Sequence, residues 1–253
     1  MKKIKISAVS YLNTLPFIYG IEQNLELLEQ VELTKDIPSE CAKKLIEGEV
    51  DLGLVPVAII PELDQSYIIS DYCIGAEGKV KSVLLLSDVP IHQIESIYLD
   101  YHSRTSVKLC EILCKKFWEV NPKFISAEKG FEEKIQGKTA GVIIGDRTFH
   151  LNKEYAYQYD LAEEWQKMTG LPFVFAAWVS NKKLPKEFIE AFNSALIHGV
   201  SNIKKAIEIQ ENLPIPKKVL TNYLSQNISY KFDKQKMKAL ILFQNYLKTA
   251  KPR

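Results

Sequence analysis

The chain of 253 residues is long enough to bury a substantial core, and 46% of its residues are hydrophobic, as in ordinary globular proteins. Its 33 basic and 31 acidic residues leave a net charge of +2 with no polybasic block, so no nucleic-acid partner is expected. The longest apolar run, residues 173–179, is far too short to cross a bilayer. Polar residues from Lys5 onward interrupt the apolar stretch that an export signal needs. We therefore expect a cytoplasmic protein without a membrane partner.

The first part of the chain alternates predicted strands with predicted helices. The strands are expected at residues 4–9, 31–35 and 51–55. Pro16 suits the first turn of one intervening helix, and the other begins near Pro38 and stops at Gly48. Strands and helices at these spacings predict a parallel sheet with right-handed crossovers.

The middle of the chain repeats this pattern. Strands are predicted at residues 94–99 and 139–144, with a helix from about Ser103 to Phe117 between them. The apolar runs 81–86 and 173–178 are then the candidates for the two hinge crossings between this unit and the first. After Pro185 the pattern is helical only, and we expect these helices to pack on the first unit.

These elements predict an α/β fold with two lobes. Residues 1–86 and 177–253 are expected to form lobe one, and residues 87–176 lobe two. Each lobe should be a mostly parallel sheet flanked by helices.

Polar segments that follow the predicted strands outline a binding cleft, because open α/β sheets bind ligands at the carboxyl ends of their strands. Ser103 to Ser106 open a helix, so their hydroxyls and free N–H groups could hold a carboxylate, although plain capping also explains them. Asp146 ends a strand, where an acid serves as a base or as a helix cap. The expected substrate-binding residues are Ser10, Tyr11, Val55, Pro56, Ser103, Arg104, Thr105, Ser106, Gly145 and Trp178.

Metal and cofactor chemistry is not indicated. The four cysteines form no Cys-x-x-Cys pair and are expected to be reduced thiols. Cys110 and Cys114 are four residues apart, as two metal ligands could be, but they share an apolar helix stripe and are interpreted as core. No Ser-His-Asp grouping and no glycine-rich phosphate loop is present, so we expect neither a metal nor a cofactor.

Six parts of the chain carry a resemblance to a known family: residues 7–16, 54–58, 82–85, 99–100 with 103–107, 144–146 and 159–176. In this order they resemble the chorismate dehydratases of the futalosine route to menaquinone. The first and last segments are specific, those between are individually weak, and the helical tail carries no diagnostic motif. The resemblance implies a periplasmic-binding-protein-like fold of the second type and removal of water from chorismate, a small dianion, to give 3-[(1-carboxyvinyl)oxy]benzoate.

Asn13, Ser82 and Asp146 are the candidate catalytic residues. Asn13 follows the first strand and Ser82 opens a crossing strand, so both can face the ligand. An amide is no base near pH 7, and a serine without a neighbouring histidine is poorly activated, so we expect both to orient the substrate by hydrogen bonds. The proton acceptor is then either Asp146 or the enolpyruvyl carboxylate of the substrate, and the lack of an obvious base among the motif residues favours the substrate.

Three other functions share the predicted fold. A plain binding protein would usually carry an export signal, and a regulator's effector domain would need an attached DNA-binding helix pair. The related enzyme that forms 1,4-dihydroxy-6-naphthoate is the third, but the opening from Ser10 to Thr14 resembles the dehydratase instead. No feature of the sequence indicates an oligomeric state.

Overall fold

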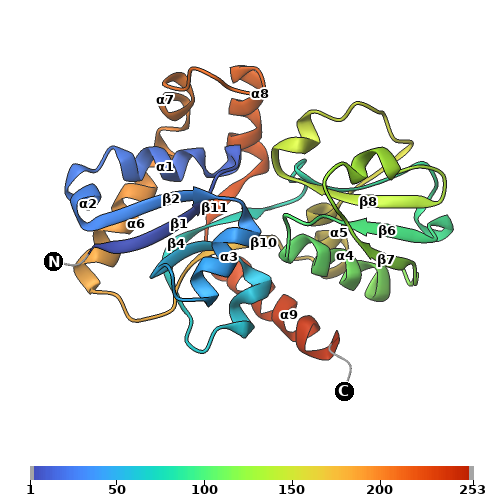
Figure 1. Ribbon diagram of the computed structural model, residues 1–253, viewed down its shortest axis with the longest axis horizontal. Helices are drawn as coiled ribbons and strands as arrows, with labels where there is room; N and C mark the ends of the chain where they lie inside the picture. The colour runs from blue at the N-terminus through green and yellow to red at the C-terminus, as the bar shows by residue number, and fades with distance from the viewer. Residues whose placement is uncertain (1–2, 251–253) are drawn as a thin grey trace.

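The computed structural model describes residues 3–250 and shows two lobes side by side, each built on its own sheet (Figure 1). The strand order in the first lobe is β11 (Ser229–Lys231), β4 (Tyr67–Ala76), β10 (Phe173–Ser180), β3 (Leu52–Pro56), β1 (Ile4–Val9) and β2 (Val31–Asp36). In the second lobe the order is β7 (Lys123–Ser126), β6 (Ser96–Leu99), β8 (Thr139–Ile144), β5 (Val83–Ser87) and β9 (Tyr157–Asp160). The expected α/β architecture is confirmed.

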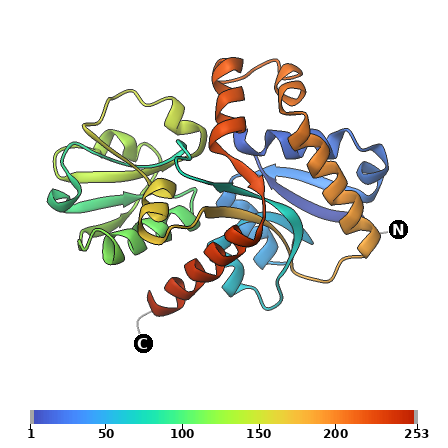
Figure 2. The ribbon, with the colours of Figure 1, turned by 180° about the vertical axis from the view of Figure 1, so that it is seen from behind.

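Helices cover both faces of the first sheet. On one face α1 (Leu15–Glu22) packs against α6 (Lys186–Ser201), and on the other lie α3 (Pro38–Ile46) and α9 (Lys234–Ala250) (Figures 1 and 2). α9 packs on β10 and reaches α4 (Thr105–Lys116) of the second lobe. The other helices are α2 (Leu25–Gln30), α7 (Ile203–Glu208) and α8 (Lys217–Asn222), with α4 (Thr105–Lys116) and α5 (Leu161–Thr169) packed together beside the second sheet.

Local sequence signals set the ends of several elements. Pro16 lies in the first turn of α1 and Pro38 in that of α3, where a missing N–H costs no helical hydrogen bond. The Asp160 side chain accepts hydrogen bonds from the backbone N–H groups of Ala162 and Glu163 and so caps α5. The predicted strands at 4–9 and 139–144 are confirmed to the residue.

Both sheets are mixed, whereas mostly parallel sheets were expected. β1 pairs in parallel with β2 and β3, but β10 runs antiparallel to both β3 and β4. In the second sheet β5 runs antiparallel to both β8 and β9. The reason is the path of the chain. It leaves the first lobe through β4 and returns through β10, so an outgoing and a returning strand lie side by side.

The crossings between the lobes lie earlier in the chain than expected. β5 pairs entirely within the second sheet and β10 within the first, so residues 83–86 and 173–176 each lie in the lobe opposite to the one expected. The connections that join the sheets are therefore residues 77–82 and 170–172. The reason is that an apolar run does not show which sheet it will pair with. The short strand β11 was also not expected, because the sequence after Pro185 predicted helices only.

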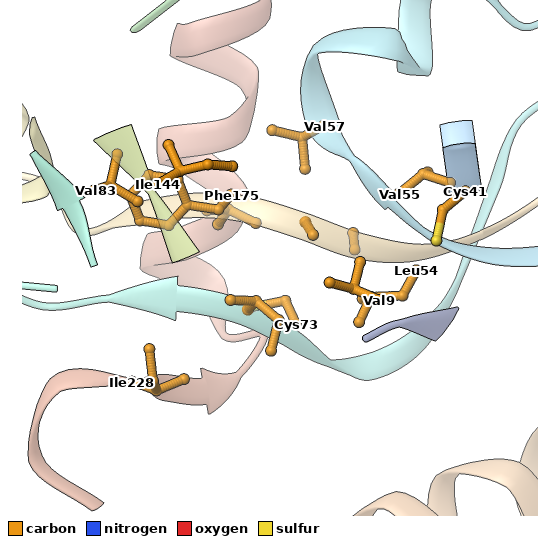
Figure 3. Close-up of a cluster of buried hydrophobic side chains, with 14 of the residues drawn as sticks. Val9, Cys41, Leu54, Val55, Val57, Cys73, Val83, Ile144, Phe175 and Ile228 are labelled. Carbon is orange, nitrogen blue, oxygen red and sulfur yellow. The ribbon is translucent and has the colours of Figure 1, made fainter. Parts of the chain in front are cut away.

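One apolar core runs through the junction of the lobes. Val83 and Ile144 of the second sheet lie beside Phe175 of the first (Figure 3). All four cysteines are buried as free thiols, as predicted, and Cys110 and Cys114 pack in the core. Because the same core continues across the junction, side chains at the inner edges of both sheets are held close together.

The crossing of α1 and α6 depends on two glycines. A Cβ atom at Gly20 would lie 1.9 Å from the Ala195 carbonyl oxygen, and one at Gly199 would lie 1.8 Å from the Pro16 carbonyl oxygen. Neither backbone oxygen can move aside as the end of a flexible side chain would. The two helix backbones are therefore in direct contact.

Gly199→Ala should destabilise the protein by about 1–3 kcal/mol or more, because the added methyl group forces the two helices apart. Thermal or urea unfolding measures the loss. Ser194→Ala, at an exposed position of the same helix, is the control and should change stability little. Equal stability of the two variants would contradict the contact.

Candidate active site

A pocket with an empty volume of about 530 Å³ lies between the lobes, at the carboxyl ends of β1, β3 and β8. This is where open α/β sheets bind ligands. Within residues 3–250 its lining carries no Lys, Arg, Asp or Glu. The lining consists of Val9, Tyr11, Asn13, Pro38, Pro56, Ile74, Val80, Ser82, Val83, Ser103, Thr105, Ser106, Ile144, Gly145, Phe175 and Ala176.

The first turn of α4 provides most of the polar groups on the second-lobe side. The Ser103 hydroxyl accepts a hydrogen bond from the Ser106 backbone N–H at 2.9 Å, which caps the helix. Thr105 Oγ1 accepts one from the backbone N–H of Ala58 at 3.2 Å, across the cleft. The N-terminus of α4 thus presents hydroxyls and a partial positive charge to the pocket.

Asn13 and Ser82 both line the pocket, where the sequence placed them. Asn13 Oδ1 accepts a hydrogen bond from the Thr14 hydroxyl at 3.1 Å. Ser82 is buried, and its hydroxyl accepts a hydrogen bond from the Tyr223 hydroxyl at 2.7 Å. Tyr223 could not be predicted from the sequence, because it lies in the helical tail, more than a hundred residues from Ser82.

Tyr11 and Gly145 bring the lobes together on another side of the pocket. Gly145 has φ +67°, and a Cβ atom there would lie 2.6 Å from the Tyr11 ring, so only glycine permits this approach. The Tyr11 hydroxyl is 2.7 Å from Nδ1 of His102. Burial raises the pKa of the Tyr11 phenol, which keeps it protonated.

Asp146 lies outside the pocket lining and joins the two lobes. Both of its carboxylate oxygens accept hydrogen bonds from the Leu12 backbone N–H at 3.2 Å. Burial raises its pKa from 3.8 to about 6, while the Leu12 N–H and His150 act in the opposite direction. Asp146 therefore links the second lobe to the segment before Asn13.

Four of the expected binding residues do not line the pocket, which corrects the sequence interpretation. Ser10 is exposed, and its backbone N–H bonds to the Asp36 carbonyl. Val55 is buried in the central strand β3. Trp178 is fully buried in the first-lobe core against Phe17 and Phe192.

The fourth is Arg104. Its guanidinium lies 3.4 Å from the Glu62 carboxylate, and its side chain is 42% exposed. Arg104 precedes the first turn of α4, so its side chain points to the outer rim while Ser103 and Thr105 point inward. Pro56 and Ser106, by contrast, line the pocket as expected.

The acid at the end of β6 has a structural role. The carboxylate of buried Asp100 contacts the Arg147 guanidinium and accepts the backbone N–H groups of His102 and Ile144. Arg147 also bonds to Glu132 at 2.6 Å. Residues 3–250 contain no group of three or more His, Cys, Asp or Glu side chains that could hold a metal ion, and no helix among them could span a membrane.

The chain matches a known protein family over nearly its whole length. A family model described as menaquinone biosynthesis matches residues 4–249. The chorismate dehydratase of Thermus thermophilus is 25% identical over 248 residues, covering 88% of each chain, and that of Campylobacter jejuni is 28% identical over 236 residues, covering 92% of this chain and 88% of its own.

Solved structures show the fold. A crystal structure of an Archaeoglobus fulgidus protein superposes with a TM-score of 0.77 at 14% identity, covering 98% of this chain and 97% of that one. A Candida albicans protein described as having the generic periplasmic binding protein fold gives a TM-score of 0.66 at 13% identity, covering 100% and 92%. The expected periplasmic-binding-protein-like fold is confirmed.

Asp146→Asn should make the protein more stable at pH 7.5. A folded-state pKa raised above the unfolded value adds stability below about pH 4, and that stability is lost as the pH rises through 6. Asn keeps an oxygen for the Leu12 N–H without the charge, so the gain should reach up to about 3 kcal/mol at pH 7.5 and vanish near pH 4. Urea unfolding at both pH values measures it.

Asp88→Asn is the matched control, because the hydrogen bond from Lys153 lowers the pKa of Asp88. This variant should be less stable than the wild type at pH 7.5. A stability difference for Asp146→Asn that is the same at both pH values would contradict the raised pKa.

Proposed function

Because the chain belongs to the menaquinone-biosynthesis family, we propose that it is a chorismate dehydratase, which eliminates water from chorismate to give 3-[(1-carboxyvinyl)oxy]benzoate. The pocket carries the proposal: hydroxyls and a helix N-terminus face an apolar wall of Val80, Val83 and Phe175. This combination suits a flat ring that bears carboxylates. The curated dehydratases that align with nearly the whole chain support the same assignment.

The first turn of α4 is assigned to a substrate carboxylate. The pocket lining within residues 3–250 offers no cationic side chain, so binding depends on the free N–H groups of the helix and on the hydroxyls of Ser103, Thr105 and Ser106. The ring carboxylate of chorismate is conjugated to C3 through a ring double bond. Donors placed here would stabilise the charge that moves onto that carboxylate as the C3 proton leaves.

The elimination is redox-neutral. The C3–H bond breaks and its electron pair forms the third ring double bond, between C3 and C4, while the C4–O bond breaks. The hydroxyl leaves with a proton as water, and the ring becomes aromatic, so proton removal from C3 is the difficult step. Asn13 orients the ring, and Ser82 donates a hydrogen bond to the departing hydroxyl.

The substrate's own enolpyruvyl carboxylate is the preferred proton acceptor. Asp146, the alternative, bonds to the Leu12 N–H and does not line the pocket. The other acid near the cleft, Asp100, is committed to Arg147 and two backbone groups. The enolpyruvyl group is attached to C3 itself, which puts its carboxylate within reach of the C3 proton.

Incubation of the purified protein with chorismate tests the proposal. Loss of the diene absorbance, with mass spectrometry showing a product lighter by one water, is the expected result. The rate should survive EDTA, because the elimination needs no electron acceptor and the base is part of the substrate. Chorismate that binds but is recovered unchanged would indicate a binding protein instead.

Thr105→Val should lower kcat/KM for chorismate by about tenfold or more, because a hydrogen bond to a charged group contributes about 1.5–3 kcal/mol. The change removes one hydroxyl at nearly constant volume. Thr221→Val is the control: its hydroxyl bonds to the Lys217 carbonyl of its own helix, and kcat/KM should stay within about twofold. An unchanged kcat/KM in Thr105→Val would show that this helix end does not hold the substrate.

A further inference from the structure

Tyr223 lies behind the pocket, in a part of the chain without a recognisable motif. It opens a π-helical turn, η6 (Tyr223–Asn227), which connects α8 to β11. Figure 1 shows α8 at the side of the first lobe that is nearest the second lobe. Turns of this kind are rare and often occur at functional sites, because they rotate one side chain out of the regular helical position.

The Tyr223 side chain is held firmly. Its residue is 3% exposed, and its ring meets Phe149 of the second lobe edge-on at 5.0 Å between centroids. Its hydroxyl donates to Ser82 Oγ at 2.7 Å, and the Asn13 side chain also interacts with it. A single phenol therefore contacts both polar side chains assigned to the reacting part of the substrate.

The direction of this hydrogen bond decides what Ser82 can do. A serine hydroxyl has one proton and two lone pairs. Because Tyr223 donates, one lone pair of Ser82 Oγ is occupied and its own proton remains available for a group in the pocket. Burial raises the pKa of the Tyr223 phenol, so the phenol keeps its proton, and that proton points to Ser82 Oγ. A hydrogen bond received at the oxygen also polarises the Ser82 O–H bond and makes it a better donor.

A second tyrosine of the same tail acts on the neighbouring segment. The hydroxyl of buried Tyr230, in β11, donates to the backbone carbonyl of Asn13 at 3.0 Å. The tail thus contacts the Asn13 segment twice and Ser82 once. These contacts give the tail a part in the site and not merely in the packing of the first lobe.

We propose that Tyr223 is a positioning residue that fixes the Ser82 hydroxyl as hydrogen-bond donor to the C4 hydroxyl that leaves the substrate. The inference rests on the proposed function. Tyr223 itself does not touch the reacting atoms. Ser82 keeps its proton overall: the proton taken from C3 accompanies the departing hydroxyl, and Ser82 only stabilises the negative charge on that oxygen as the C4–O bond breaks.

Tyr223→Phe removes the hydroxyl alone and should lower kcat about tenfold or more, with KM for chorismate changed by less than about threefold. In a Ser82→Ala background the same change should have no further effect on kcat, because Tyr223 acts through Ser82. Tyr155→Phe is the control. Its hydroxyl donates to the Glu132 carbonyl at 3.3 Å and does not line the pocket, so its kcat should equal that of the wild type.

Calorimetric binding of the product, 3-[(1-carboxyvinyl)oxy]benzoate, shows whether the pocket of Tyr223→Phe is intact. Should this variant fail to fold, Phe149→Leu keeps both hydroxyls, loosens the Tyr223 ring and should lower kcat about threefold or more. A kcat within twofold of the wild type in the folded variant, or an equal loss with and without Ser82, overturns the inference. A wild-type protein that leaves chorismate unchanged overturns the proposed function instead, and the inference with it.

Discussion

The hydrogen bond from the Ala58 backbone N–H to Thr105 Oγ1 joins the first turn of α4 to the opposite lobe, and the site depends on where that turn lies. The pocket lining within residues 3–250 has no cationic side chain, so the proposed carboxylate would be held by the helix end and its hydroxyls. The field of a helix end falls off within its first turn. If the lobes shifted and this turn moved away from Asn13 and Ser82, the proposed substrate would lose the groups that stabilise its charge. It would also lose the orientation that Asn13 and Ser82 give it.

The ionisable groups near the cleft serve to assemble the site. Asp100 binds Arg147, Asp146 holds the Leu12 N–H, and the Tyr11 phenol meets His102. Each contact joins segments that are far apart in sequence, and two of the three join the lobes. A site whose acids are committed in this way suits a reaction in which the substrate carries the base, because the protein needs only to orient and to stabilise charge.

Local signals in the sequence predicted the elements well and their partners poorly. Pro38 and the polar turn at Ser103 marked helix starts, and the runs at 4–9 and 139–144 marked strands, because these depend on neighbours in sequence. Asn13 and Ser82 line the pocket because they adjoin such strands. The surroundings of three other residues could not be predicted. Trp178 is buried in the core, Arg104 contacts Glu62, and Tyr223 bonds to Ser82. Each of these contacts involves residues that only the folded chain brings near.

The glycine contact between α1 and α6 bears on how rigid the loop that carries Asn13 is. Gly199 abuts the carbonyl of Pro16, three residues after Asn13, so the helix that follows the loop is fixed by a backbone contact outside the pocket. A loop anchored at that point has little freedom left to lose when a ligand arrives. Part of the affinity is thus set in advance by a helix crossing that no ligand touches, and changes at Gly20 or Gly199 would act on binding through the entropy of the free protein.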